Sequence, residues 1–287
     1  MTRSTSAPTL SDVARQAGVS TATVSRCLNA PDRVVEETRQ RVMQAVESLG
    51  YVPNFGARAM AAKRTFTIGA IIPTMENAIF ARGLQAFQEE LHASGYTLLV
   101  ASSAYRPEVE EEQIRALVAR GADGLLLIGH DRDPAIHDYL RRQGVPAMVA
   151  WTFADGLDRP AIGFDNRAAM ARLAAEVLAR GHRRIGVISG LRQGNDRARH
   201  RVEGVQDAMA AAGLAAAELA VEEAPYEIEH GAAALDRLLV RVPGLTAVIC
   251  GNDVLATGAL RRAREQGLAV PGDLSITGFD DIELARI

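Results

Sequence analysis

The sequence predicts a small all-α head followed by an α/β core of two doubly wound parallel-sheet lobes. Three observations predict this fold class. Two helix-start signals flank a glycine within residues 9–29. From Thr67 onward short apolar runs alternate with helical stretches, and the same alternation begins again near Ile185. The chain has 287 residues, 48% of them hydrophobic, so it is long enough to bury more than one core.

The head begins with two short helices joined by a tight turn. Thr9 and Asp12 have the Ser/Thr-x-x-Asp/Glu spacing of a capping box, which predicts a helix start. Gly18 is expected to make the turn, because glycine reaches positive φ at little cost. Ser20 is expected to cap the second helix. These signals together predict a helix-turn-helix.

The second predicted helix combines a buried side with a polar one. Val24 and Leu28 lie four residues apart and are expected to be buried. The start of such a helix faces base edges in the major groove of DNA. We predict direct base readout by Arg26, whose guanidinium can donate to guanine O6 and N7 together; the alternative is a phosphate contact. The expected contacts from this helix are Thr21, Ala22, Ser25 and Arg26.

A third helix is expected from Val35 to Leu49, with Gly50 as its stop. Its predicted buried stripe is Val42, Met43, Val46 and Leu49. Residues 1–53 are therefore predicted to form the head. Residues 54–65 are predicted to be a hinge helix or linker, because this Ala-rich segment is too short to be a stable helix without a partner.

Charge is distributed unevenly along the chain. Residues 1–64 contain nine Lys and Arg against five Asp and Glu, whereas the remainder contains 23 and 30. A basic head on an acidic body is typical of a DNA-binding module joined to one that does not bind DNA.

The core shows two similar halves. Its first short apolar runs are typical of buried parallel strands, and helical stretches separate them. The runs are 68–72, 98–101, 124–128 and 147–150, and the helices are 80–94, 108–120 and 133–143. Residues 185–188 repeat the pattern of residues 68–71. We predict lobes at 66–163 and 164–287, with a ligand cleft where the strands end.

Several other classes of protein are disfavoured by the sequence. It contains no Gly-rich phosphate loop, nucleophile elbow or His-Glu-x-x-His motif, and its six histidines lack metal-ligand spacing, so we expect no enzyme, cofactor or metal site. It has no apolar run of membrane-spanning length and no signal peptide. Cys27 and Cys250 lie in different predicted domains, so we expect free thiols in a cytoplasmic protein.

The motifs resemble those of the LacI/GalR family of bacterial transcription repressors, whose core is similar to periplasmic sugar-binding proteins. The resemblance extends from Thr9 to the last residue. The motifs that carry it are Val13-Ala-x2-Ala17-Gly-Val-Ser20-x2-Thr23-Val-Ser-Arg26-x2-Asn29, Thr38-Arg39 and Leu49-Gly-Tyr-x-Pro-Asn54. The resemblance implies a homodimer that binds near-palindromic operator DNA and a small-molecule effector.

The resemblance also implies DNA contacts in the hinge. Met60 is expected to insert into the minor groove as an apolar wedge; alternatively, it packs between paired hinge helices. Arg58 is expected to contact a phosphate or the groove, since no acidic residue lies within four positions of it.

In the cleft, the resemblance implies that Arg201 clamps the ligand, that Asn252 and Asp280 bond its hydroxyls, and that an aromatic ring covers its apolar face. The alternatives are turn chemistry for the last two and surface or packing roles for weaker candidates. Such a set of groups suits a polyol. The expected effector contacts are Phe80, Arg197, Arg201, Tyr226, Asn252 and Asp280.

The segments 72–80 and 105–110 resemble the gluconate-repressor branch, so a sugar acid is the first expectation for the effector. Arg192, Arg197 and Arg201 near the cleft agree with an anionic ligand.

We therefore expect a repressor whose operator affinity is controlled by a sugar or sugar acid bound between two lobes. The chain ends at Ile287, where members of the family continue, which suggests a truncated product. The alternative is thus a truncated, sensor-incompetent or dominant-negative form of such a repressor. A freestanding sugar-binding protein would need a secretion signal and would not use a helix-turn-helix.

Overall fold

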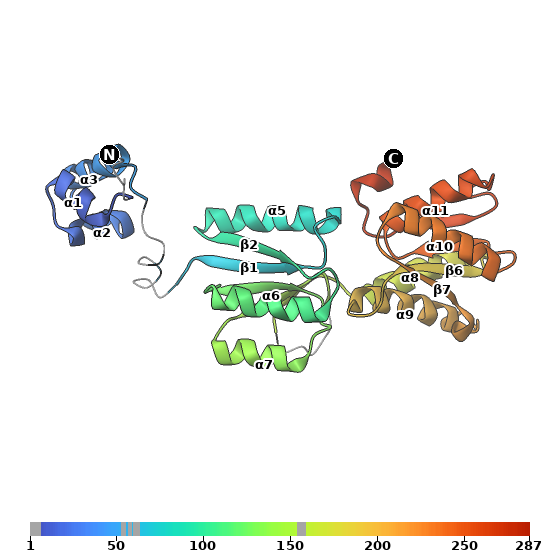
Figure 1. The fold of residues 1–287 in the computed structure, drawn as a ribbon. Helices are drawn as coiled ribbons and strands as arrows, with labels where there is room; N and C mark the ends of the chain where they lie inside the picture. The colour runs from blue at the N-terminus through green and yellow to red at the C-terminus, as the bar shows by residue number, and fades with distance from the viewer. Residues whose placement is uncertain (1–6, 53–55, 57–58, 60–63, 154–158) are drawn as a thin grey trace, which may run out of the picture. The chain divides into compact units, whose positions relative to one another are not determined.

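The structure is a computed structural model that describes residues 7–52, 56, 59, 64–153 and 159–287. Met1–Thr65 and Phe66–Ile287 form two compact units (Figure 1). The predicted hinge contacts Arg58 and Met60 lie outside the described residues. Within the described residues, no helix is both long enough and apolar enough to cross a membrane.

The first unit has the predicted helix-turn-helix. Its capping box is present, since Thr9 accepts from the Asp12 backbone and Asp12 accepts in return. Gly18 adopts a φ of 67°, and the Ser20 hydroxyl accepts from the backbone of Thr23 at 3.1 Å. The elements are α1 (Leu10–Ala17), α2 (Thr21–Asn29), η1 (Pro31–Arg33) and α3 (Glu36–Leu49).

The three helices of this unit enclose a small apolar core. Its fully buried members include Val13, Val24 and Val42. The expectation for Met43 was wrong, because its side chain is 46% exposed. Residue 43 lies one position, about 100°, around the helix from Val42, and Ala45 takes the buried place on that face.

The first lobe of the second unit is a parallel five-stranded sheet in the order β2-β1-β3-β4-β5. Helix α5 covers one face, while α6 and α7 cover the other (Figure 1). The strands are β1 (Thr67–Ile72), β2 (Thr97–Ser102), β3 (Gly124–Ile128), β4 (Ala147–Ala150) and β5 (Ala161–Ile162). The helices are α5 (Ala78–Ala93), α6 (Pro107–Ala119) and α7 (Pro134–Gln143).

The second lobe is a parallel four-stranded sheet in the order β7-β6-β8-β9. This order repeats the β2-β1-β3-β4 order of the first lobe, which confirms the predicted duplication and fold class. The strands are β6 (Ile185–Gly190), β7 (Ala220–Ala224), β8 (Ala247–Cys250) and β9 (Ser275–Thr277). The helices are α8 (Asn166–Ala179), α9 (Asp196–Ala211), α10 (Ile228–Arg241) and α11 (Asp253–Glu265), with short turns η2 (Ala216–Glu218) and η3 (Glu283–Arg286).

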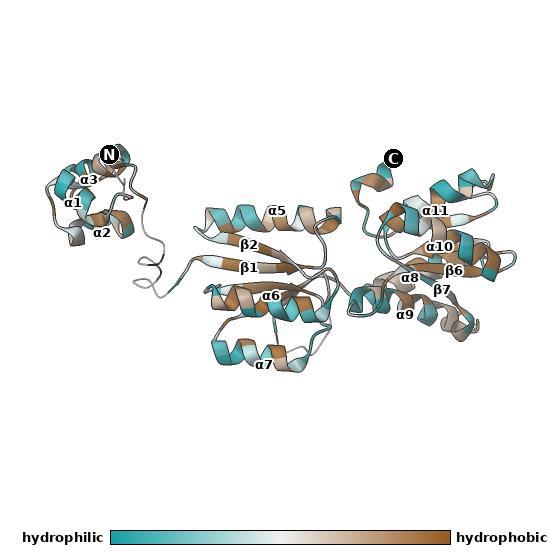
Figure 2. Ribbon diagram, viewed as in Figure 1, coloured by the Kyte–Doolittle hydropathy of each residue, from teal (hydrophilic) through white to brown (hydrophobic). Residues whose placement is uncertain are grey.

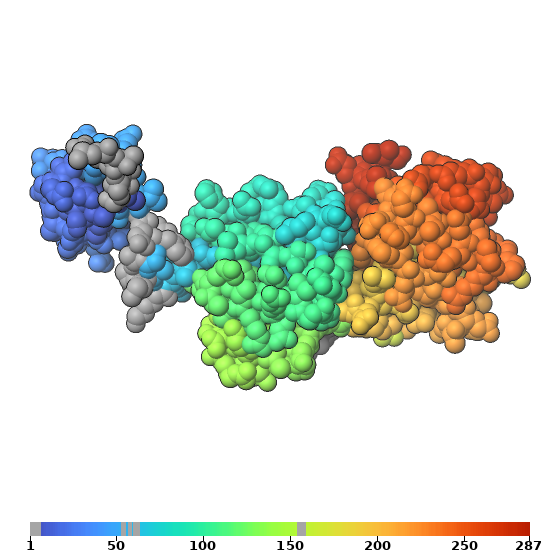
Figure 3. All heavy atoms as spheres, viewed as in Figure 1, coloured from blue at the N-terminus to red at the C-terminus, as the bar shows by residue number. Residues whose placement is uncertain are grey.

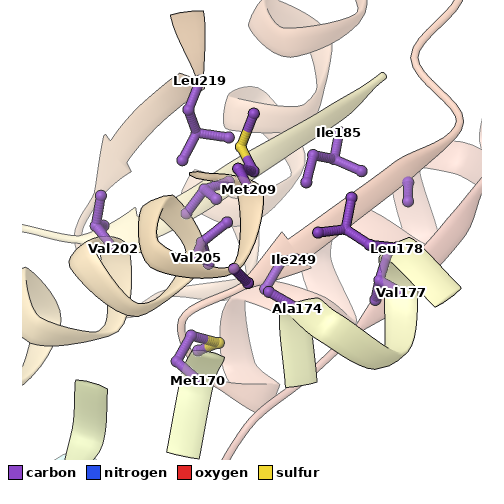
Figure 4. Packing of buried hydrophobic residues seen from close by; sticks show 13 residues of the cluster. Met170, Ala174, Val177, Leu178, Ile185, Val202, Val205, Met209, Leu219 and Ile249 are labelled. Carbon is purple, nitrogen blue, oxygen red and sulfur yellow. The ribbon is translucent and has the colours of Figure 1, made fainter. Parts of the chain in front are cut away.

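Apolar side chains fill the space between each sheet and its helices. Figure 2 shows mostly the hydrophobic colour on the strands and both colours on the helices. Figure 4 shows the cluster between α8, α9 and the second sheet, where Met170, Val205 and Ile249 converge. Helices α8 and α9 approach closely at Gly204, because a Cβ there would lie 2.2 Å from the Arg167 carbonyl oxygen.

Candidate DNA-reading helix and interlobe effector cleft

Helix α2 presents the side chains that were predicted to read DNA. Thr21, Ala22 and Arg26 are exposed, and Ser25 is half-buried. The Asn29 amide donates to the Ser25 carbonyl at 2.9 Å and to its hydroxyl at 3.3 Å, which fixes the position of that hydroxyl.

Arg26 differs from Arg15 and Arg39 of the same unit. Arg15 pairs with Asp12 at 3.2 Å, and Arg39 pairs with Glu36 at 2.5 Å. Arg26 has no acidic partner in the described part of this unit. Its five guanidinium donors are therefore available to an external acceptor.

The two lobes of the second unit lie against each other in Figure 3, the first in cyan to green and the second in yellow to red. A cavity of about 300 Å³ lies between them. The first lobe supplies the loops after β1 and β2, and the second lobe supplies the loops after β6 and β7. This is the predicted position for a ligand site in an open α/β sheet. The lining residues include Asn77 and Tyr105 from the first lobe and Leu191, Asn195 and Tyr226 from the second.

Arg201 and Asp280 form a pair whose charges act on Tyr105 of the cavity wall, although neither side chain lines the cavity itself. The Arg201 guanidinium donates to Asp280 at 3.2 Å and to the Gly251 carbonyl at 2.6 Å, and its Nε donates to Asn166 at 2.9 Å. It also lies 4.0 Å above the Phe279 ring centroid. Burial raises the pKa of Asp280, an effect that the nearby Arg201 charge opposes. The two groups form a buried, hydrogen-bonded ion pair.

Arg197 and Tyr226 are close to the same site. The buried Arg197 side chain pairs with Asp196 at 2.8 Å. The Tyr226 ring lies 5.9 Å from that of Tyr105, and its hydroxyl is 3.5 Å from the Asn195 amide. Burial raises the pKa of Tyr105, so its hydroxyl stays neutral and can donate a hydrogen bond.

Phe80 and Asn252, also expected to contact the effector, do not line the cavity. Phe80 is 4% exposed and packs at 5.3 Å against Trp151 inside the first lobe, which leaves its ring no face toward the cleft. The apolar spacing of Phe80, Leu84 and Phe87 on α5 is the signal for this burial. Asn252 caps α11 by accepting from the Leu255 backbone at 2.9 Å, the turn chemistry weighed above.

Tyr105 and Asn195 line the cavity, although neither was among the expected effector contacts. Tyr105 lies three residues after β2, and Asn195 lies directly before α9. Their positions between a strand end and a helix start are the signal that could have identified them.

Polar contacts between α9 and the β3–α7 loop are among those that join the lobes. Asp131 accepts two bonds of 2.7 Å from Arg199, and Asp196 accepts from the His130 backbone at 2.6 Å. At Gly129, whose φ is 74°, a Cβ would lie 2.0 Å from the Arg197 guanidinium. The β3–α7 loop thus lies directly against the start of α9.

Comparison with known families matches both units. Residues 9–54 match the LacI family of bacterial regulatory proteins. Residues 65–285 match the family of periplasmic binding proteins and sugar-binding domains of the LacI family. The chain belongs to the LacI family. This confirms the resemblance seen in its motifs.

Individual relatives agree with this assignment. The HTH-type transcriptional repressor CytR of Escherichia coli K12 is 34% identical over 98% of this LacI-family chain and 82% of its own length. A LacI-family regulator from Silicibacter pomeroyi superposes with a TM-score of 0.87 at 30% identity, over 97% of this chain and 84% of its own. The Lac repressor dimer bound to operator and the anti-inducer ONPF gives 0.84 at 26% identity, with the same coverage. These relatives are transcriptional regulators, and so is this chain.

Proposed function

We propose that this LacI-family regulator is a homodimeric repressor that reads a near-palindromic operator through α2 and responds to a small ligand in the interlobe cleft. The observation that carries the proposal is the division of chemistry between the two units. One unit has a helix whose exposed side carries an arginine without an acidic partner in the described residues, and the other has a cavity with apolar and polar walls at its strand ends. The similarity to the operator-bound Lac repressor dimer supports two heads on two half-sites.

On the DNA side, Arg26 is assigned to a guanine edge, and Thr21 and Ala22 to neighbouring bases. Ser25 is assigned a supporting contact, because its hydroxyl already accepts from Asn29. Arg58 and Met60 keep their proposed groove and wedge roles. Residues 1–53 act as the head, 54–65 as the hinge, and 66–163 and 164–287 as the lobes.

On the ligand side, Arg201 and Asp280 are assigned to ligand hydroxyls, with Arg197, Tyr226 and Tyr105 completing the wall of the site. Phe80 and Asn252 are assigned to packing and helix capping. No step of this function requires catalysis, so the chain acts as a regulator and not as an enzyme. Its DNA target places its action in the cytoplasm.

The ligand and the operator are coupled through the angle between the lobes. Ligand contacts both lobes, so it favours one interlobe angle, and the first lobe passes that change to the hinge. Such coupling is typically about 1–3 kcal/mol and is reciprocal.

The test is operator selection from a pool of random duplexes with the full-length chain, followed by fluorescence anisotropy. The proposal predicts recovery of an inverted repeat that binds more tightly than its scrambled control. Binding of both duplexes should weaken as salt rises, since the contacts to phosphate release counterions. Equal affinity for the selected and scrambled duplexes would overturn the proposal.

A further inference from the structure

Four arginines near the effector cleft have acidic partners within the chain. These pairs lie in the loops and helix starts at the cleft, and their shortest N–O distances are between 2.7 and 3.2 Å. The pairs are Arg192–Glu223, Arg197–Asp196, Arg199–Asp131 and Arg201–Asp280.

The pairs Arg197–Asp196 and Arg201–Asp280 are the most buried of the four. The Arg197 and Arg201 side chains are each 9% exposed, and their partners Asp196 and Asp280 are 2% and 6% exposed. Breaking a buried ion pair leaves one charge uncompensated, which is strongly unfavourable. A ligand carboxylate that bound either arginine would have to displace an acid already fixed in place. A ligand hydroxyl, by contrast, can share both partners, because it donates to the acid and accepts from the arginine.

The remaining charges near the cavity are mostly negative. Glu76 and Glu227 line its rim and are exposed, and Glu227 also contacts His230 at 3.0 Å. Arg106 lines a smaller hollow next to the cavity and is exposed. Glu110, in the same hollow, is paired with Arg132 at 2.7 Å. Two rim carboxylates against one solvated arginine disfavour an incoming anion.

The rest of the cavity wall is neutral. Its apolar side includes Tyr105, Tyr226 and Leu191, which offer ring and alkyl surface. Its neutral polar side includes Asn77 and Asn195, whose amide oxygens cap α5 and α9. The volume of about 300 Å³ is at the lower end of the range for small-molecule sites.

We infer that the effector is an uncharged ring compound that carries hydroxyl groups, and that carboxylate or phosphate analogues of the same skeleton are excluded. The inference rests on the proposed function of the cleft. It departs from the sugar acid favoured by the sequence, because the arginines that favoured an anion are already neutralised inside the chain.

The experiment measures thermal stabilisation of the full-length chain by matched ligands that differ only in charge. The pairs are glucose with gluconate, galactose with galacturonate, and uridine with uridine 5′-monophosphate, all at constant ionic strength. We expect at least one neutral compound to stabilise the protein and its charged partner to bind at least tenfold more weakly. The inference would be overturned if a charged compound bound more tightly than its neutral partner, if the two bound equally, or if no compound stabilised the protein.

A variant gives an independent test of the cause. Asp196→Asn frees the Arg197 charge while keeping the size of the side chain, so affinity for the charged partners should rise about tenfold. Asp207→Asn is the matched control, because it removes the shorter of the two acidic contacts of Arg167, on α8 and α9, leaves Glu203 at 3.6 Å, and should leave ligand preference unchanged. An unchanged preference in Asp196→Asn would contradict the inference. Glu223→Gln frees the more exposed Arg192 and should raise the affinity for charged ligands by a smaller factor. This variant replaces Asp196→Asn in the test if Asp196→Asn does not fold.

Operator binding separates the two proposals. If a charged compound binds best while the selected operator is still recognised, only the inference about charge fails. If no duplex is preferred, the proposed function fails, whichever ligand binds.

Discussion

Arg26 of the first unit and the buried arginines near the cleft of the second unit differ in whether a carboxylate pairs with them. On α2 of the first unit, Arg26 is exposed and has no acidic partner in the described residues. At the cleft of the second unit, the buried arginines are each held by a carboxylate. An unpaired cation suits a polyanion such as DNA, whereas a paired one supplies directional hydrogen bonds without net charge. The difference teaches that arginine count alone does not predict the charge of a ligand.

Arg201→Ala should have the largest effect, because it leaves the buried Asp280 uncompensated and removes bonds to Asn166 and Gly251. We expect the core to lose about 3–5 kcal/mol in denaturant unfolding and the effector response to disappear. Arg180→Ala, on an exposed surface pair, is the control. Specific operator binding should persist below the new midpoint; equal loss of ligand and DNA binding would contradict the division between the units.

Arg26→Ala should leave folding unchanged and weaken operator binding by about 1–3 kcal/mol, with relaxed preference at one position in each half-site. Fluorescence anisotropy with operator variants that differ by one base measures both the affinity and the base preference. Arg15→Ala is the matched control, since Arg15 is exposed but paired with Asp12. If every sequence weakened equally, Arg26 would contact only phosphate.

Ser20→Ala tests whether the two units are stabilised separately. Loss of the bond to the Thr23 backbone should cost the head about 1 kcal/mol, whereas Ser20→Gly should cost only a few tenths. Calorimetry should show a lower melting temperature for the head and an unchanged melting temperature for the core. A matching shift in the core transition would show that the units unfold together.

Asp131→Asn should have the smallest effect, because the Asp131–Arg199 pair is partly exposed and such pairs contribute about 0–1 kcal/mol. The hydrogen bond from Arg199 lowers the pKa of Asp131 from its usual 3.8. The stabilisation is therefore complete above the unfolded pKa and is lost as pH falls through the lowered folded pKa. The stability difference between wild type and variant should vanish on acidification; a difference that persists below that range would contradict this assignment.

Local signals in the sequence were enough to predict much of the fold. The capping box at Thr9, the turn at Gly18 and the short apolar strand runs each depend on neighbouring residues. Met43 was misplaced because apolar character alone does not decide which side of a helix faces the core. Its neighbour Val42 occupies that side.

The site was harder to predict, because it depends on contacts between distant residues. Phe80 follows a strand end, as a ligand contact would, but packing against Trp151 decides its role. The arginines suggested an anion because the acidic partners of Arg192 and Arg201 lie on other segments of the chain, although Asp196 is adjacent to Arg197. Sequence spacing could not show this neutralisation.

A ligand bound in the core should control the affinity of the head for operator DNA. The most direct test measures the dissociation constant of the neutral ligand with and without operator, and that of the operator with and without ligand. The account predicts that the two ratios are equal and differ from one. A ligand that binds the cleft but leaves operator affinity unchanged would contradict it.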